Sequence, residues 1–394
     1  MREGYYRNET RRASGSRKPT KGEVSIGGRL VDAVMLAVTA VAVVALLCSL
    51  LAGVVDPRGS VLFAFAGLFY PIIWVANLFC AFWWAARWKR YFVVPVVMLL
   101  IGSGSMGLFY RSDISTKPED VSREKNDLVV VTYNVMNFSD EDAPEGVINF
   151  DRVAEWINTQ SPQVVLLQEA YFSADRNFER FKEKVKRLPY GYFVNAELAN
   201  EGSQTGSGYA LLSAYPIVRR GVASADSLQY KALWADLRVG RDTVRVINNH
   251  LQSTGISQDE RATTLTHRIV GDSLAQEKLS GVADKMRENY RLRAAQADQL
   301  ADFVTSSPHP VIMAGDFNDT PKSYVYRTIR KCDLLDAFVE KGRGVEHTFK
   351  GLFNLFRIDY VMASEEHFAV KEYASHDEPM SDHKPLTVRL GVLD

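Results

Sequence analysis

The chain has 394 residues and carries 47 Lys or Arg against 47 Asp or Glu, so its formal net charge is zero. The charge is unevenly placed: residues 1–111 hold thirteen basic and five acidic residues, whereas residues 112–394 hold 34 and 42. This length favours two or more structural units, and the three cysteines form neither a disulfide framework nor a CxxC metal spacing.

Three long apolar segments lie in the first 110 residues. They span about 30–55, 61–86 and 91–110, and Asp32 is the one charged residue within them. Each reaches roughly the 20 residues that an α-helix needs to cross a bilayer. We expect three transmembrane helices, because three such segments in a row do not suit a buried core and the first is too long for a cleaved signal peptide.

Basic residues set the expected orientation. The polar leader, residues 1–29, holds eight Lys or Arg and is expected to be disordered, and the loop after the second segment reads RWKR (87–90). The positive-inside rule places both in the cytoplasm, where lipid headgroups explain the charge more simply than nucleic acid does. Three crossings then predict a bacterial inner-membrane protein whose C-terminal domain is periplasmic.

Residues 111–126 are polar and are expected to form a linker, after which the pattern changes. Short strand-like runs lie at 127–135, 163–170, 208–215, 233–239, 243–251, 310–317, 357–364 and 385–390, with helical spacing at 150–160 and 284–304. Many strands, fewer helices and several short connections predict a mixed α/β domain over residues 127–394, with largely antiparallel sheets.

Most of the strand-like runs end on a polar residue that suits a metal ion or a phosphate. These residues are Asn134, Glu169, His250, Asp316, Asn318, Asp359, Asp382 and His383. Each taken alone has a structural explanation, such as a turn cap for Asn134 or a hydrogen-bonded core position for His250. Together they supply the carboxylate and amide oxygens that a hard cation such as Mg²⁺ prefers, and the groups that phosphoester hydrolysis needs.

Five motifs carry a family resemblance. They are TYNV (132–135), LQE (167–169), GDFN (315–318), RIDYV (357–361) and SDHKP (381–385). In this order they resemble the endonuclease/exonuclease/phosphatase superfamily, which includes pancreatic-type deoxyribonucleases, abasic-site endonucleases, neutral sphingomyelinases and inositol polyphosphate 5-phosphatases. The resemblance covers residues 127–391. It implies a four-layer α/β sandwich with two central mixed sheets, preceded here by the three membrane helices.

The resemblance also implies a metal-dependent reaction. Glu169 is expected to be the principal ligand of Mg²⁺, or of Mn²⁺ as the alternative, with Asn134 beside it and Asp382 at the same ion. Phosphoester cleavage relies mainly on positioning and charge neutralisation, so it needs no Cys or Ser nucleophile. Cys332 is therefore expected to take no part in the chemistry.

The remaining motif residues are assigned to the reaction itself by the same resemblance. Asp316 is expected to orient or deprotonate the attacking water, Asn318 to hydrogen-bond the phosphate, and His250 to contact the phosphoryl group. His383 is expected to be the second catalytic histidine, with Asp359 accepting its other ring N–H. Such an acid–histidine pair fixes the tautomer and raises the histidine pKa.

The sequence leaves the substrate open among nucleic acid, phospholipid headgroups and small phosphate esters. The net charge of −8 on residues 112–394 argues against tracking along a polyanion, whereas NNHLQST (248–254) is similar to a motif of the tyrosyl-DNA phosphodiesterase branch. Residues 255–295 read either as a solvated helical face or as a substrate-selecting flap, and His347 as a structural or a site residue.

Two further function classes compete with the membrane-anchored phosphoesterase. One is a non-catalytic, membrane-tethered binding module with the same fold, which the complete set of motif residues disfavours. The other is a transporter or channel, for which the apolar segments offer no ionisable residue in mid-membrane.

Overall fold

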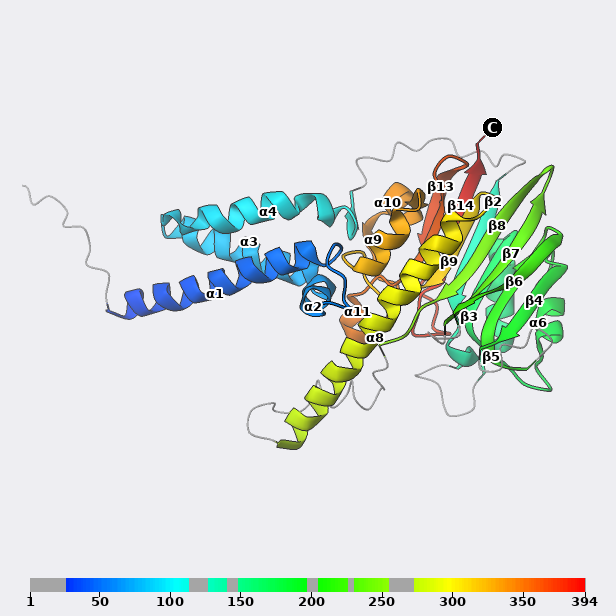
Figure 1. Ribbon diagram of the computed structural model, residues 1–394, viewed down its shortest axis with the longest axis horizontal. Coiled ribbons are helices and arrows are strands. Elements are labelled where there is room, and N and C mark those ends of the chain that lie inside the picture. Colours follow the sequence, from blue (N-terminus) through cyan, green and yellow to red (C-terminus); the bar gives the residue numbers. More distant parts are fainter. Residues whose placement is uncertain are drawn as a thin grey trace, which may run out of the picture.

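The computed structural model describes residues 26–112, 127–139, 148–196, 205–225, 230–254 and 273–393. An apolar helical bundle at one end adjoins a larger α/β body (Figure 1). Most of the predicted leader (1–29), most of the predicted linker (111–126) and residues 255–272 of the expected flap lie outside the described residues.

Two six-stranded sheets form the centre of the body. The first sheet has the order β10 (Leu334–Asp336), β12 (Asp359–Ser364), β9 (Val311–Asp316), β8 (Asp242–His250), β7 (Tyr230–Val239) and β6 (Ile217–Ala225). The second has the order β13 (Phe368–Ser375), β14 (Leu386–Val392), β2 (Leu128–Asn134), β3 (Val164–Phe172), β5 (Gly206–Ser213) and β4 (Tyr190–Asn195). Each sheet holds one parallel pair, β8 with β9 and β2 with β3, among antiparallel neighbours. The prediction of two mixed, largely antiparallel sheets is confirmed.

Helices cover the outer faces of both sheets, which gives four layers. The inner faces pack on each other through residues such as Val130, Leu166, Val246 and Ile312. Helices α5 (Phe150–Gln160) and α6 (Phe178–Lys184) pack on the second sheet, and α8 (Ser273–Thr305) and α9 (Tyr324–Arg330) on the first. Short elements α10 (Ala337–Lys341), α11 (Gly351–Asn354) and the 3₁₀ turn η3 (Met136–Phe138) lie in the connections.

The N-terminal apolar part differs from the three spans expected. It forms α1 (Ile26–Leu51), α2 (Leu62–Leu68), α3 (Tyr70–Ala86), a 3₁₀ turn η1 (Arg90–Phe92) and α4 (Val93–Met106). Among the described helices, α1 alone is long and apolar enough to cross a membrane, while α2 and α3 qualify only as a pair that is bent by 76° and α4 is shorter. The prediction of three full-length spans is wrong in this respect. Pro71 in the first turn of α3 explains the bend, because its ring excludes a continuous helix through this point.

The segment that leaves the helical bundle joins the body through a short pair of strands. Strand β1 (Tyr110–Arg111) pairs antiparallel with β11 (Gly344–Val345). Arg111, the first residue of the predicted linker, belongs to this strand, and residues 113–126 of that linker lie outside the described residues.

Candidate active site

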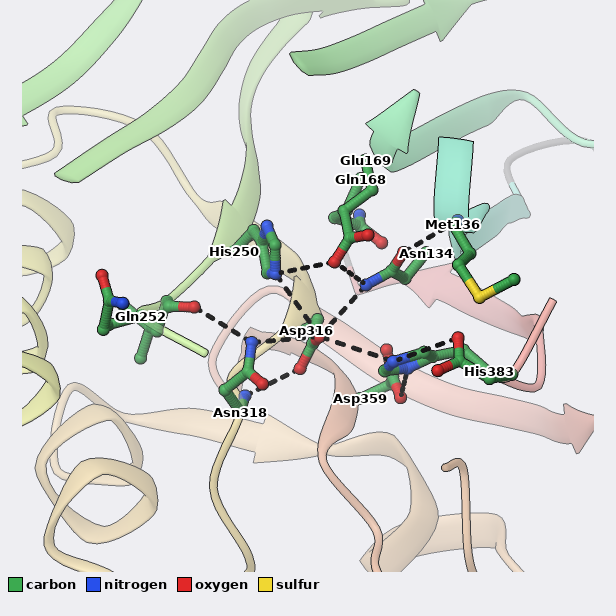
Figure 2. A network of polar contacts seen from close by, with 12 residues as sticks. Asn134, Met136, Gln168, Glu169, His250, Gln252, Asp316, Asn318, Asp359 and His383 are labelled. Carbon is green, nitrogen blue, oxygen red and sulfur yellow. Dashed lines mark hydrogen bonds and ion pairs between the residues drawn. The ribbon is translucent and has the colours of Figure 1, made fainter. Parts of the chain in front are cut away.

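Four neighbouring strands deliver the candidate site residues to one edge of the sandwich. Asn134 ends β2 and Glu169 lies near the end of its parallel partner β3, while His250 and Asp316 end the parallel pair β8 and β9. The carboxyl ends of parallel neighbours meet at the same edge of a sheet. Because the two sheets stack face to face, the four side chains converge (Figure 2).

Special backbone conformations aim these side chains. Glu169 has φ of 48°, inside the irregularity that interrupts the pairing of β3 with β5, and Asn318 has φ of 51°. Gly315 has φ of 138°, and a Cβ there would lie 1.9 Å from the carbonyl oxygen of Asn249. A side chain at position 315 would therefore push β9 away from β8. Left-handed residues and bulges are features that redirect side chains at functional sites.

Asn134, Glu169 and Asp316 contact one another directly. Nδ2 of Asn134 donates to Oε1 of Glu169 at 3.0 Å and to Oδ2 of Asp316 at 3.2 Å. Its Oδ1 accepts the N–H of Met136 at 3.1 Å. Nε2 of His250 lies 3.5 Å from Glu169 Oε1 and 3.6 Å from Asp316 Oδ2, and it is buried without a hydrogen bond.

Asp316 and Asn318 act as one unit, as their shared face in the sequence suggests. The N–H of Asn318 donates to Asp316 Oδ1 at 2.7 Å, and its Nδ2 donates to Asp316 Oδ2 at 3.1 Å. The same Nδ2 reaches the carbonyl oxygen of Leu251 at 3.0 Å, immediately after His250 (Figure 2). These bonds fix the loop after β9 against the loop after β8.

His383 lies on the other side of Asp316. Its Nδ1 is 2.9 Å from Oδ2 of Asp359, and its Nε2 is 3.8 Å from Asp316 Oδ2 and 3.9 Å from Asp382 Oδ1. The ring of Phe349 packs on the ring of His383 with centroids 5.2 Å apart. The backbone N–H of Asp359 in turn donates to the hydroxyl of Thr348 at 3.0 Å, which holds β12 at this height.

Burial and charge set the protonation of this cluster. Burial raises the pKa of Asp316 to about 6, an effect strengthened by the nearby charge of Asp359. Burial lowers the pKa of His383, but the carboxylates of Asp359 and Asp316 outweigh it and raise that pKa to about 10. With these pKa values, His383 is an imidazolium at neutral pH, and the neighbouring carboxyl group of Asp316 is mostly ionised.

The donor atoms of the site suit a hard divalent cation. Oε1 of Glu169 and Oδ2 of Asp316 both lie within hydrogen-bond distance of Asn134 Nδ2 and within 3.6 Å of the Nε2 of His250, and carboxylate and amide oxygens are the ligands of Mg²⁺ and Mn²⁺. In the described part of the chain, the tightest group of ligating side chains is Asp316, Asp359 and His383, whose donor atoms all lie within 4.8 Å of one another. This group differs from the predicted ligand set of Asn134, Glu169 and Asp382.

A polar layer beneath the site joins Asn248, which the sequence places on the same face of its strand as His250, to Gln168, which sequence reasoning missed. Gln168 Nε2 donates to Asn248 Oδ1 at 2.7 Å across the two sheets, and Asn248 Nδ2 donates to the carbonyl oxygens of Leu167 and Ala210. The available signal was Gln168 itself, an amide side chain within the strand-like run at 163–170. The side chain of His347, by contrast, lies beside Lys384, with Nε2 and Nζ 2.8 Å apart.

Two family models match separate parts of the chain. A model of the Endonuclease/Exonuclease/phosphatase family matches residues 131–383, and a domain of unknown function (DUF8431) matches residues 32–109. No curated protein matches the chain.

Several solved structures are similar to part of the chain. An endonuclease/exonuclease/phosphatase from Beutenbergia cavernae is 22% identical, with 68% of this chain and 72% of that chain covered and a TM-score of 0.49. A family protein from Bacteroides thetaiotaomicron is 18% identical, with 69% and 97% covered and a TM-score of 0.48. A mannosyl-6-phosphatase from the same species is 17% identical, with 67% and 99% covered and a TM-score of 0.46.

The family match spans more than half of the chain and includes every motif that carries site residues, apart from the last two positions of SDHKP. The chain therefore belongs to the Endonuclease/Exonuclease/phosphatase family, whose members are phosphoester hydrolases.

Proposed function

We propose that this protein is a membrane-anchored phosphoesterase that depends on a divalent metal and acts on phosphodiesters. The observation that carries the proposal is the convergence of Glu169, His250 and Asp316 at one edge of the sandwich, with the Asp359–His383 pair beside them. A cluster of three acids and two histidines, of which Asp316, Asp359 and His383 are buried, is costly to fold, and such clusters concentrate at catalytic sites.

Glu169, Asn134 and Asp382 are the proposed ligands of Mg²⁺, with Mn²⁺ as the alternative. The unpaired Nε2 of His250 beside two carboxylates supports a cation or a phosphoryl oxygen at this place. When bound, the ion supplies a Lewis acid that polarises the phosphoryl group and offsets its negative charge.

The side chains of the chain itself divide the remaining work. Asp316, once ionised, orients a water molecule for attack and accepts its proton. Asn318 holds the Asp316 carboxylate in place through its backbone N–H and its side-chain amide. The Nε2 of His250 is free to donate to a phosphoryl oxygen. His383, kept as an imidazolium by Asp359, places positive charge where the pentavalent transition state is negative.

The apolar bundle is proposed as the membrane anchor. Large apolar side chains point away from its core, for example Val41 at 70%, Phe82 at 69% and Leu100 at 68% exposure, which a soluble surface disfavours. The basic loop between α3 and α4 lies at the end away from the body (Figure 1). With that loop in the cytoplasm, the body is periplasmic in a bacterial inner membrane.

The substrate class remains a choice between nucleic acid and a lipid or small-molecule phosphoester. The acidic body, with a net charge of −8 over residues 112–394, favours the second choice. A non-catalytic binding module with this fold is the alternative function, and the complete set of acidic and histidine side chains argues against it.

The test is hydrolysis by the full chain in nanodiscs with Mg²⁺. Bis(p-nitrophenyl) phosphate serves as a generic diester, and plasmid DNA and phospholipid vesicles serve as class probes. Asp316→Asn and a chelator should abolish turnover, while Glu366→Gln, an exposed carboxylate-to-amide control, should not. Turnover that survives both Asp316→Asn and chelation contradicts the proposal.

A further inference from the structure

The inner end of the helical bundle packs on the segments that carry the site residues. Leu68, at the end of α2, packs on a mainly aromatic cluster, which consists of Phe349, Phe356 and the aliphatic Ile358. The ring of Phe69 meets that of Phe356 edge-on, with centroids 6.3 Å apart. The bend between α2 and α3 therefore places two large apolar side chains directly on the body.

The aromatic cluster leads to His383 in one step. Phe349, which Leu68 helps to cover through the cluster, packs on the ring of His383 with centroids 5.2 Å apart. Phe349 is also joined by backbone bridges to Phe356 and to His383 itself. Residues 349 and 356–358 thus form a layer between the bundle and the imidazole.

A second set of contacts fixes the loop that follows Asp316 and Asn318. A Cβ added at Gly67 would lie 2.3 Å from the carbonyl oxygen of Lys322, so α2 lies against this loop as closely as a backbone can. Nζ of Lys322 donates to Ser105 Oγ at 2.9 Å, at the end of α4. The ring of Phe65 meets that of Tyr290 on α8 with centroids 5.5 Å apart.

The start of the RIDYV strand is also joined to the bundle. Nη2 of Arg357 donates at 2.9 Å to the carbonyl oxygen of Leu108, just after α4. Arg357 is itself buried against Asp336, with oxygen–nitrogen distances of 3.0 and 2.9 Å. Asp359, the partner of His383, lies two residues further along.

We propose that Leu68 is a positioning residue for His383, and that the bundle is therefore part of the catalytic structure rather than a tether alone. Leu68 supports the cluster and with it Phe349, which packs on the imidazole, so the ring keeps its place between Asp359 and Asp316. The inference rests on the proposed hydrolase function. An apolar tether would need no side chain packed against the layer that supports a site histidine.

The test compares Leu68→Ala with Leu62→Ala in the full chain in nanodiscs. Both changes remove the same atoms from the same short helix, but Leu62 is 60% exposed and is not in the aromatic cluster. We expect Leu68→Ala to lower kcat on bis(p-nitrophenyl) phosphate by about tenfold with KM unchanged, because a small displacement of a catalytic group has effects of this order. Leu68→Met should restore the rate, since its volume is similar.

A second measurement does not depend on turnover. In ¹⁵N-histidine-labelled protein the imidazole signals of His383 are identified by their loss in His383→Gln. Leu68→Ala should shift them and Leu62→Ala should not. If the wild type has no turnover, the proposed function fails while this measurement still tests the contact. Equal behaviour of the two alanine variants in rate and spectrum overturns the inference. If Leu68→Ala does not fold, Leu68→Val supplies the same comparison.

Discussion

Replacing Asp359 with Asn tests the acid–histidine pair at the centre of the proposed mechanism. Oδ2 of Asp359 lies 2.9 Å from Nδ1 of His383, and both side chains are buried. A hydrogen bond to a charged group contributes about 1.5–3 kcal/mol net, and about 1.36 kcal/mol corresponds to a tenfold change in rate. If this much of the bond's strength is gained only on reaching the transition state, Asp359→Asn should lower kcat by roughly 10- to 150-fold, with KM little changed.

The pH dependence of the rate provides a second, independent test of this prediction. The Asp359 carboxylate helps to raise the pKa of His383 to about 10. Removing its charge lowers that pKa, so the alkaline limb of the rate profile should move to lower pH. The pKa of Asp316 should also fall from about 6, because Asp359 stands opposite it in the register of β12 and β9.

The assay is steady-state hydrolysis of bis(p-nitrophenyl) phosphate by the full chain across the acid and alkaline range. Glu366→Gln is the charge-matched control, since it makes the same chemical change in the exposed turn after β12. A wild-type kcat together with an unmoved alkaline limb in Asp359→Asn would refute the role of the pair.

Three further outcomes are expected. Gly315→Ala should lower the free energy of unfolding by about 1–3 kcal/mol, because its methyl group would lie 1.9 Å from a backbone oxygen. Gly281→Ala, in open space on α8, should not destabilise the protein, and chemical denaturation measures both variants. Arg357→Met should lower the free energy of unfolding by about 3–5 kcal/mol, because it leaves Asp336 buried without its ion-pair partner. Adding Asp336→Leu should recover part of this loss in the same assay. The rate should fall as pH drops through about 6, where Asp316 takes up a proton and can no longer accept one from water; a flat pH–rate profile there excludes Asp316 as the base.

Much of the body was predictable from local patterns. The alternation and apolar runs that form β2, β3, β8 and β9 are strong in the sequence because these central strands are buried on both faces. Edge strands were harder to recognise: β6 and β13 carry exposed polar residues, and neither these two nor the edge strand β4 were predicted. The site residues stood out for a related reason, since polar side chains at the ends of apolar strands are conspicuous.

The sequence by itself determined the composition of the candidate site and the apolar character of the N-terminal part. Only the tertiary structure decided which donor atoms meet, because Asn134, Glu169 and Asp316 come from separate strands, His383 comes from the segment before β14, and their approach depends on how two sheets stack. It also decided that the second apolar segment bends and rests on the body. Hydropathy reports whether a residue prefers to leave water, but not whether lipid or another part of the same chain will cover it.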